Sequence, residues 1–70
     1  MFKANARRIG RDFVGGVACE TAESAAAHLL MLMKADGYGG DEAETLEQLV
    51  RGEAVQHKRF EYQVTEGGGA

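Results

Sequence analysis

One cysteine and two histidines are the side chains of this sequence that could act as nucleophile, proton carrier or metal ligand: Cys19, His28 and His57. A thiolate beside an imidazole is a nucleophile, and the three together could hold zinc. Their spacing fits neither use, because no CxxC motif or His/Cys cluster is present. Cys19 alternates in step with Phe13 and Val17, so we interpret it as a buried structural thiol. The sequence predicts no metal site.

Two further patterns could carry chemistry, and neither fits the reaction that it resembles. The glycine pairs Gly15-Gly16 and Gly39-Gly40 lack the GxxxxGK[ST] frame of a phosphate-binding loop. The acids between residues 42 and 47 lie on a solvated helix, without the apolar surroundings that glycoside chemistry requires. We therefore predict a protein that is not an enzyme, with no catalytic residue and no cofactor.

The charges are segregated along the chain, and the net charge of −3 hides this. Residues 1–11 hold four cations and no acid, whereas residues 41–53 hold five acids against Arg51 alone. We expect two surfaces of opposite sign, which suit docking on a charged partner. The candidate acidic contact residues are Glu42, Glu44 and Glu47, and the candidate basic ones are Lys3, Arg7, Arg8, Arg11 and Arg59.

Strands are expected at both ends of the chain. Apolar and polar residues alternate over residues 2–7, the period of a strand with one buried face. Gly10 marks a turn, and a second alternating segment over 13–20 predicts an antiparallel hairpin. A last strand is expected at about 54–65.

Two helices are expected between these strands. Thr21 is a suitable N-cap for a helix over 22–36, and Gly37 supplies a left-handed stop. Asp41 begins a second helix in an approximate capping box, and Gly52 ends it.

The element order is strand, strand, helix, helix, strand. It predicts an α+β fold in which a three-stranded antiparallel sheet carries both helices on one face. We expect one compact domain over residues 1–65 and a disordered Gly-rich tail over 66–70. The predicted core consists of Phe2, Ala4, Ala6, Phe13, Val17, Cys19, Ala26, Leu29, Leu30, Met33, Leu46, Leu49, Val50, Phe60, Tyr62 and Val64.

The uncovered sheet face is expected to carry Lys3, Asn5 and Arg7 beside His57 and Arg59. A basic face of this kind can contact phosphates. RNA-binding sheets, however, stack bases on aromatic side chains, and all aromatic residues here are assigned to the core or to the connector between the helices. A small nucleic-acid-binding regulator is therefore the alternative function. A subunit that dimerises through its sheet edge is a further one.

A compact α+β domain, an acidic total and a charged helix (Asp41-Glu42-Ala43-Glu44-Thr45-Leu46-Glu47) resemble the small inhibitor proteins that phages encode, anti-CRISPR proteins among them. The resemblance implies binding to a larger protein or ribonucleoprotein complex and blocking of its nucleic-acid-binding or nuclease step. We expect a cytoplasmic protein, in the host cytoplasm if phage-encoded. No signal peptide or membrane span is expected, since the longest apolar run is five residues.

Overall fold

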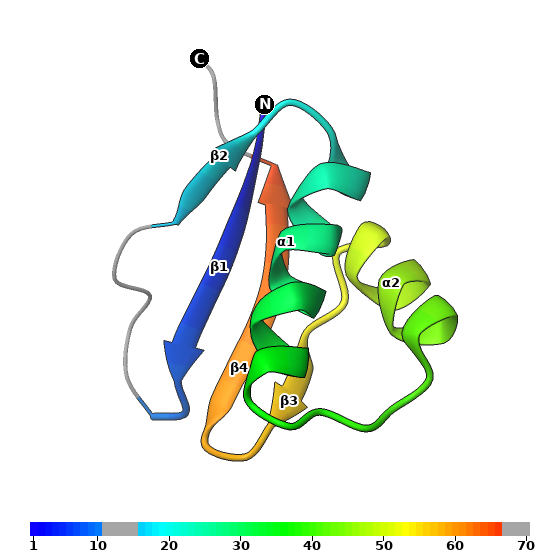
Figure 1. The fold of residues 1–70 in the computed structure, drawn as a ribbon. Coiled ribbons are helices and arrows are strands. Elements are labelled where there is room, and N and C mark those ends of the chain that lie inside the picture. Colours follow the sequence, from blue (N-terminus) through cyan, green and yellow to red (C-terminus); the bar gives the residue numbers. More distant parts are fainter. Residues whose placement is uncertain (11–15, 67–70) are drawn as a thin grey trace.

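The computed structural model describes residues 1–10 and 16–66. It shows a four-stranded antiparallel sheet with two helices on one face (Figure 1). The strand order is β2-β1-β4-β3, so β1 and β4 form the centre of the sheet. The α+β class and the antiparallel sheet are confirmed, whereas the predicted three strands are corrected to four. The elements are β1 (Phe2–Arg8), β2 (Val17–Cys19), α1 (Ala22–Ala35), α2 (Glu42–Val50), β3 (Val55–His57) and β4 (Phe60–Glu66).

The fourth strand arises because the segment predicted as one strand over 54–65 is a hairpin. His57 of β3 pairs with Phe60 of β4, which leaves a two-residue turn at Lys58 and Arg59. Lys58 has a φ of 55°, a left-handed conformation that two-residue hairpin turns use and that lysine rarely adopts. The turn places His57 on the helix-covered face. The prediction of His57 on the open face is therefore wrong, and Arg59 lies in the turn rather than within a strand.

Both helices begin after the predicted N-caps, and α1 ends at Ala35, one residue before the predicted end. Thr21 Oγ1 and Asp41 Oδ1 each accept a hydrogen bond from the backbone amide three residues later, at 3.0 and 2.9 Å. Gly37 and Gly52 follow the two helices with φ of 89° and 84°, in the left-handed region that favours glycine. These local signals fix the helix boundaries independently of tertiary contacts.

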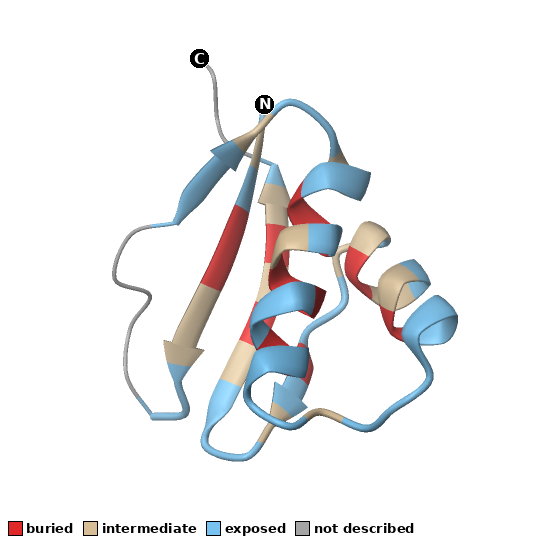
Figure 2. Ribbon diagram, in the orientation of Figure 1, coloured by how far each residue is buried: buried red, intermediate tan, exposed pale blue. Residues whose placement is uncertain are grey.

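The core lies between the helices and the covered face of the sheet, where the buried positions of both layers face each other (Figure 2). Its buried apolar residues are Ala4, Ala25, Ala26, Leu29, Leu30, Met33, Leu49, Val55, Tyr62 and Val64. Others of the predicted set pack against them partly buried: Phe2, Ala6, Cys19, Leu46 and Val50.

Two residues predicted in the core are exposed instead. Val17 is 48% exposed and Phe60 is 42% exposed. Val17 belongs to an outer strand and Phe60 adjoins the β3–β4 turn, so both lie at the margin of the layer that the helices cover. Phe13, also predicted in the core, lies outside the described residues.

The sheet face opposite the helices carries polar contacts between its own strands. Asn5, only 6% exposed, donates through Nδ2 to Thr65 Oγ1 at 2.7 Å. Arg7 donates through Nε and Nη2 to Glu61 Oε1 at 3.0 and 2.7 Å. Arg7 and Glu61 are directly opposite in the β1–β4 register, the arrangement in which cross-strand charge pairs stabilise a sheet. Two of the three polar side chains of β1 on this face are thus engaged within the sheet.

The C-terminal strand extends slightly further than the sequence predicts. β4 includes Glu66, the first residue of the predicted tail, and residues 67–70 lie outside the described part. Within residues 1–10 and 16–66, none of the helices combines the length and the apolar character needed to cross a bilayer.

Candidate interaction surface

The cysteine and the histidines considered for catalysis or metal binding lie on three different elements. Cys19 is on β2 and His57 on β3, the two outer strands, so three strand spacings of roughly 14 Å in total separate them. His28 lies on α1. Across the described residues, no three His, Cys, Asp or Glu side chains gather in a group that could hold a metal ion. The fold therefore does not bring Cys19, His28 and His57 together as a catalytic or metal-binding group.

His57 instead joins β3 to the end of α1. Its Nε2 lies 3.1 Å from the carbonyl oxygen of Asp36, the C-cap of α1, and 3.4 Å from Asp36 Oδ2. Because a carbonyl oxygen can only accept, Nε2 is the donor. Lys58 Nζ lies 3.7 Å from Asp36 Oδ1. The β3–β4 hairpin thus supplies donors to the carbonyl end of α1, where a helix leaves acceptors unpaired.

Tyr38 holds the connector between the two helices in place. Its hydroxyl is hydrogen-bonded to Thr45 Oγ1 at 2.6 Å, and its ring meets that of His57 edge-on, with centroids 5.3 Å apart. Thr45 is 3% exposed and faces inward from α2. The position of α2 relative to α1 and the sheet is therefore fixed by a buried polar contact as well as by apolar packing.

The three candidate acidic residues all lie on α2, in different surroundings. Glu42 Oε1 accepts a hydrogen bond from Lys34 Nζ of α1 at 3.0 Å, with both side chains at least half exposed. Glu44 and Glu47 are exposed, and within the described part of the chain their carboxylates form no hydrogen bond or ion pair. Asp41, the N-cap, adds a fourth acid at the start of the helix.

A second cation near these acids is Arg51, the C-cap of α2. Arg51 Nε donates to Glu53 Oε2 at 2.7 Å. This contact with Glu53 raises the pKa of Arg51, and the charges of Glu47 and Glu44 raise it further. Arg51 is thus held by Glu53 at the end of the helix, and the carboxylates of Glu44 and Glu47 stay open to solvent.

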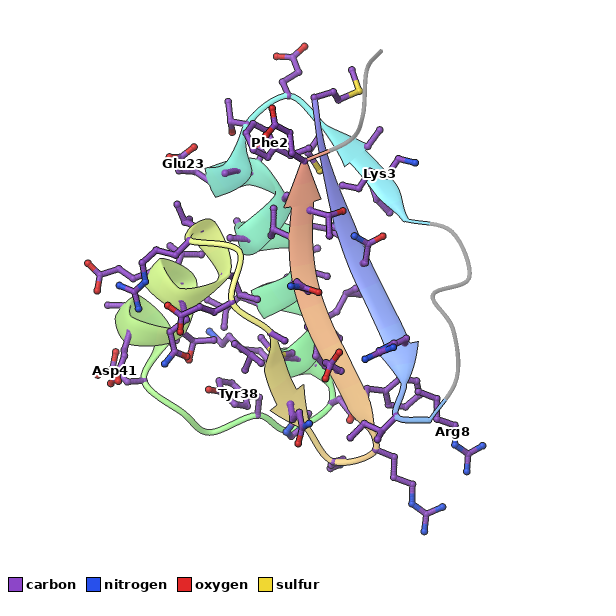
Figure 3. The ribbon with its side chains drawn as sticks, turned by 180° about the vertical axis from the view of Figure 1, so that it is seen from behind. Phe2, Lys3, Arg8, Glu23, Tyr38 and Asp41 are labelled. Carbon is purple, nitrogen blue, oxygen red and sulfur yellow. The ribbon has the colours of Figure 1, made fainter. Side chains whose placement is uncertain are left out.

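The candidate basic residues that the structure describes are divided between the two ends of β1. Lys3 and Arg8 lie at opposite ends of β1, as Figure 3 shows. The rise of an extended strand puts their Cα atoms roughly 17 Å apart. Arg7 is paired with Glu61. Arg59 joins Arg8 at the lower end of the sheet, because its carbonyl accepts the amide of Ile9 at 2.8 Å. Arg11 lies outside the described residues.

Acids predominate in the helical layer. The labelled acids of Figure 3, Glu23 and Asp41, stand at the starts of α1 and α2, whereas the labelled cations belong to β1. The separation of charge is partial, because α1 also carries Lys34 and β4 carries Glu61 and Glu66.

An apolar groove lies between α1 and α2, and the sequence analysis did not identify it. Its volume is about 320 Å³, and its walls are formed by Ala27, Leu30, Met31, Lys34, Glu42 and Leu46. Met31 is 60% exposed. The feature of the sequence that points to this groove is a second stripe on the first helix, beside the stripe that faces the core. It consists of Glu23, Ala27, Leu30 and Lys34 at positions i, i+4, i+7 and i+11.

Comparison of the chain with protein-family models, with curated proteins and with solved structures found no match in any of the three.

Proposed function

We propose that this protein is a non-catalytic inhibitor of the kind that phages and other mobile elements encode. It docks the acidic surface of α2 on a basic surface of a larger protein or ribonucleoprotein complex and blocks the nucleic-acid-binding or nuclease step of that complex. Glu42, Glu44 and Glu47 carry the contact. The observation that supports this proposal most directly is the gathering of exposed carboxylates on one helix that is rigidly held at both ends.

Rigidity matters because a surface that is already ordered pays little entropy on binding. α2 is capped by Asp41 at its start, followed by Gly52 in a left-handed conformation at its end, and tied to the connector through Thr45. The backbone from which its carboxylates extend is therefore held in place, and Glu44 and Glu47, three residues apart, share one face of the helix. A basic groove that accepts phosphates can accept such a pair of carboxylates by charge complementarity.

The basic residues are a weaker basis for function than the acids of α2. A phosphate-binding surface requires several cations within reach of one backbone. Here Lys3 is far from Arg8 along β1, and Arg7 contacts an acid. Nucleic-acid binding by the basic set is therefore an outcome of the following test rather than a second proposal.

The test is recovery of the partner from nuclease-treated bacterial lysate with tagged protein, at low and at high salt. Reversal of two charges, Glu44→Lys with Glu47→Lys, is expected to abolish recovery of a discrete complex. The matched control reverses two other exposed acids, Glu20→Lys with Glu66→Lys, and so changes the net charge by the same amount. Recovery by the control and not by the α2 variant supports docking through α2.

Two results would contradict the proposal. The first is loss of the complex with both double variants, since that would indicate a general charge effect. The second is recovery of DNA or RNA only, and only when nuclease is omitted, with a dependence on Lys3 and Arg8. In that case the protein is a nucleic-acid-binding regulator.

A further inference from the structure

The groove between α1 and α2 has the dimensions of a receptor for side chains. A buried cavity of roughly 150 Å³ accommodates a benzene molecule. The groove is about twice as large, at about 320 Å³, and it is open to solvent. It can therefore take one or two large apolar side chains of a partner without rearrangement of the helices.

The walls of the groove are apolar where the two helices face each other. Ala27, Leu30 and Met31 come from α1, and Leu46 comes from α2. Leu30 is nearly buried and Met31 is largely exposed, so the groove deepens toward the core. Methionine at its outer wall is a flexible thioether that adapts to the shape of different apolar groups.

Acids outnumber cations on the two helices that form the groove, because α1 and α2 carry Glu23, Glu42, Glu44 and Glu47 against Lys34 alone. Glu42 lies in the wall, and helical spacing puts Glu23 in line with Ala27 and Leu30 on α1. The only cation among the lining residues is Lys34, and Glu42 already holds it at 3.0 Å. A partner that brings its own lysine or arginine would therefore meet an excess of negative charge on these two helices.

From these observations we infer that the groove binds the apolar face of a basic amphipathic helix of the partner. The inference rests on the proposed function and specifies the chemistry of the segment that docks. A helix is the fitting form because two helices form the walls, which is the helix-in-groove mode of recognition. Its apolar residues enter between Met31 and Leu46, and its cations contact the carboxylates of α1 and α2. Apolar contact with a charged rim is the usual anatomy of a protein interface.

The probe is a synthetic helical peptide of leucine and lysine, about 18 residues or five turns long, with leucine confined to one face. One control peptide has the same composition in an order that removes the apolar face. A second control replaces each lysine by glutamate. The readout is the methyl resonance of the three methionines, labelled with ¹³C. Met31 lies in the groove, whereas Met33 is buried and Met1 lies at the start of the chain.

The basic amphipathic peptide is expected to shift the Met31 methyl in a saturable way and to leave that of Met1 unchanged. Neither control peptide should do so. Equal shifts with the scrambled peptide would show that charge alone is recognised. Equal shifts with the acidic peptide would show that charge is not recognised. Shifts confined to Met1 would place binding elsewhere, and each of these three results would overturn the inference.

Substitutions in the groove test the same contact by affinity. Met31→Ser is expected to weaken binding of the basic peptide about fivefold or more, as for an anchoring interface residue. The matched control is Leu32→Ser, which removes an exposed apolar residue from the neighbouring position, outside the groove lining. Because Met31 is 60% exposed, the variant is expected to fold normally, which its thermal unfolding checks. Equal weakening by both variants would contradict the inference.

The Lys34–Glu42 pair gives a second, independent measurement. Lys34→Ala releases Glu42, so the peptide should bind about two- to fivefold more tightly, the range expected for one exposed ion pair. Arg51→Ala changes the net charge equally and releases Glu53 at the end of α2, so it is the control. An equal increase in affinity in both variants would show that only net charge matters. Unchanged affinity in both would show that Glu42 does not contact the peptide.

The inference and the proposed function can fail separately. If reversal of Glu44 and Glu47 abolishes partner recovery while Met31→Ser does not affect it, the acidic helix is the docking surface and the groove inference is wrong. If the peptide binds at Met31 but the α2 charge reversal leaves the partner bound, the groove is a binding site and the proposed function is wrong.

Discussion

The hydroxyls of Tyr38 and Thr45 meet at 2.6 Å, and Thr45 is almost fully buried. Tyr38→Phe removes one partner and leaves the other hydroxyl buried, so we expect the free energy of unfolding to fall by about 1–2 kcal/mol in urea denaturation. The double variant Tyr38→Phe with Thr45→Val removes both groups and is expected to regain part of the loss. Additive losses in the double variant would show that the two hydroxyls do not stabilise each other.

Tyr62 is a core residue with a titratable side chain. Burial raises the pKa of its phenol above the ordinary value, and the negative charge of Asp36 raises it further. A raised folded-state pKa contributes stability below the unfolded value of about 10, and this contribution is lost as the pH rises through the folded value. Unfolding by urea should therefore become easier above about pH 10. Tyr62→Phe should flatten that decline, and an unchanged slope would exclude Tyr62 as its source.

At the scale of elements, the end of α1 requires a residue in the left-handed conformation. Gly37 has a φ of 89°, and a Cβ there would meet nothing within 4 Å. Gly37→Ala should therefore destabilise by about 1–2 kcal/mol, the cost of a left-handed non-glycine residue. Gly39 in the same connector has equally open surroundings and no positive φ. Gly39→Ala is expected to leave stability unchanged or to raise it by up to about 1 kcal/mol, and thermal unfolding of the pair measures the difference.

The elements that the sequence predicted correctly are those whose signals are local. Caps, stops and apolar stripes lie within one helix, and both helices were found where Thr21 and Asp41 indicated. The β3–β4 hairpin was missed because its turn residue, Lys58, carries no turn signature. Once the turn was missed, every residue before it was assigned to the wrong sheet face, His57 among them. Missing this two-residue turn therefore caused a larger error in the predicted surface than any error in a helix boundary.

The candidate site was only partly predictable for a similar reason. The acids of α2 could be read from the chain, because spacing within one helix places them. The groove could not be located from the sequence, because it depends on where α2 lies relative to α1. That position is fixed by the Tyr38–Thr45 contact and by the core that the two helices share. The basic face was predicted as a group of neighbouring cations. The β1–β4 register instead places Arg7 opposite Glu61.

At the scale of the whole molecule, charge and shape have separable roles in binding. The ion pairs between described residues lie at or near the surface and contribute little to stability, so added salt should barely change the melting temperature. Salt should instead slow association with a basic partner, because the field of the acids in the helical layer steers the encounter and is screened within about 10 Å at 0.1 M. The contacts in the groove form only after the encounter and should therefore affect dissociation and not association.

This division predicts two distinct kinetic signatures for the partner complex, measured by surface plasmon resonance at several salt concentrations. Glu44→Gln with Glu47→Gln should lower the association rate and weaken its salt dependence, because these charges steer the encounter, and should also speed dissociation, because the two carboxylates contact the partner. Met31→Ser should leave association unchanged and speed dissociation about fivefold or more, because it removes an apolar anchor. Leu32→Ser, on the same helix and outside the groove lining, should change neither rate. Faster dissociation in the charge variant, with no effect of Met31→Ser, would instead place the close contact on the carboxylates alone and leave the groove unfilled.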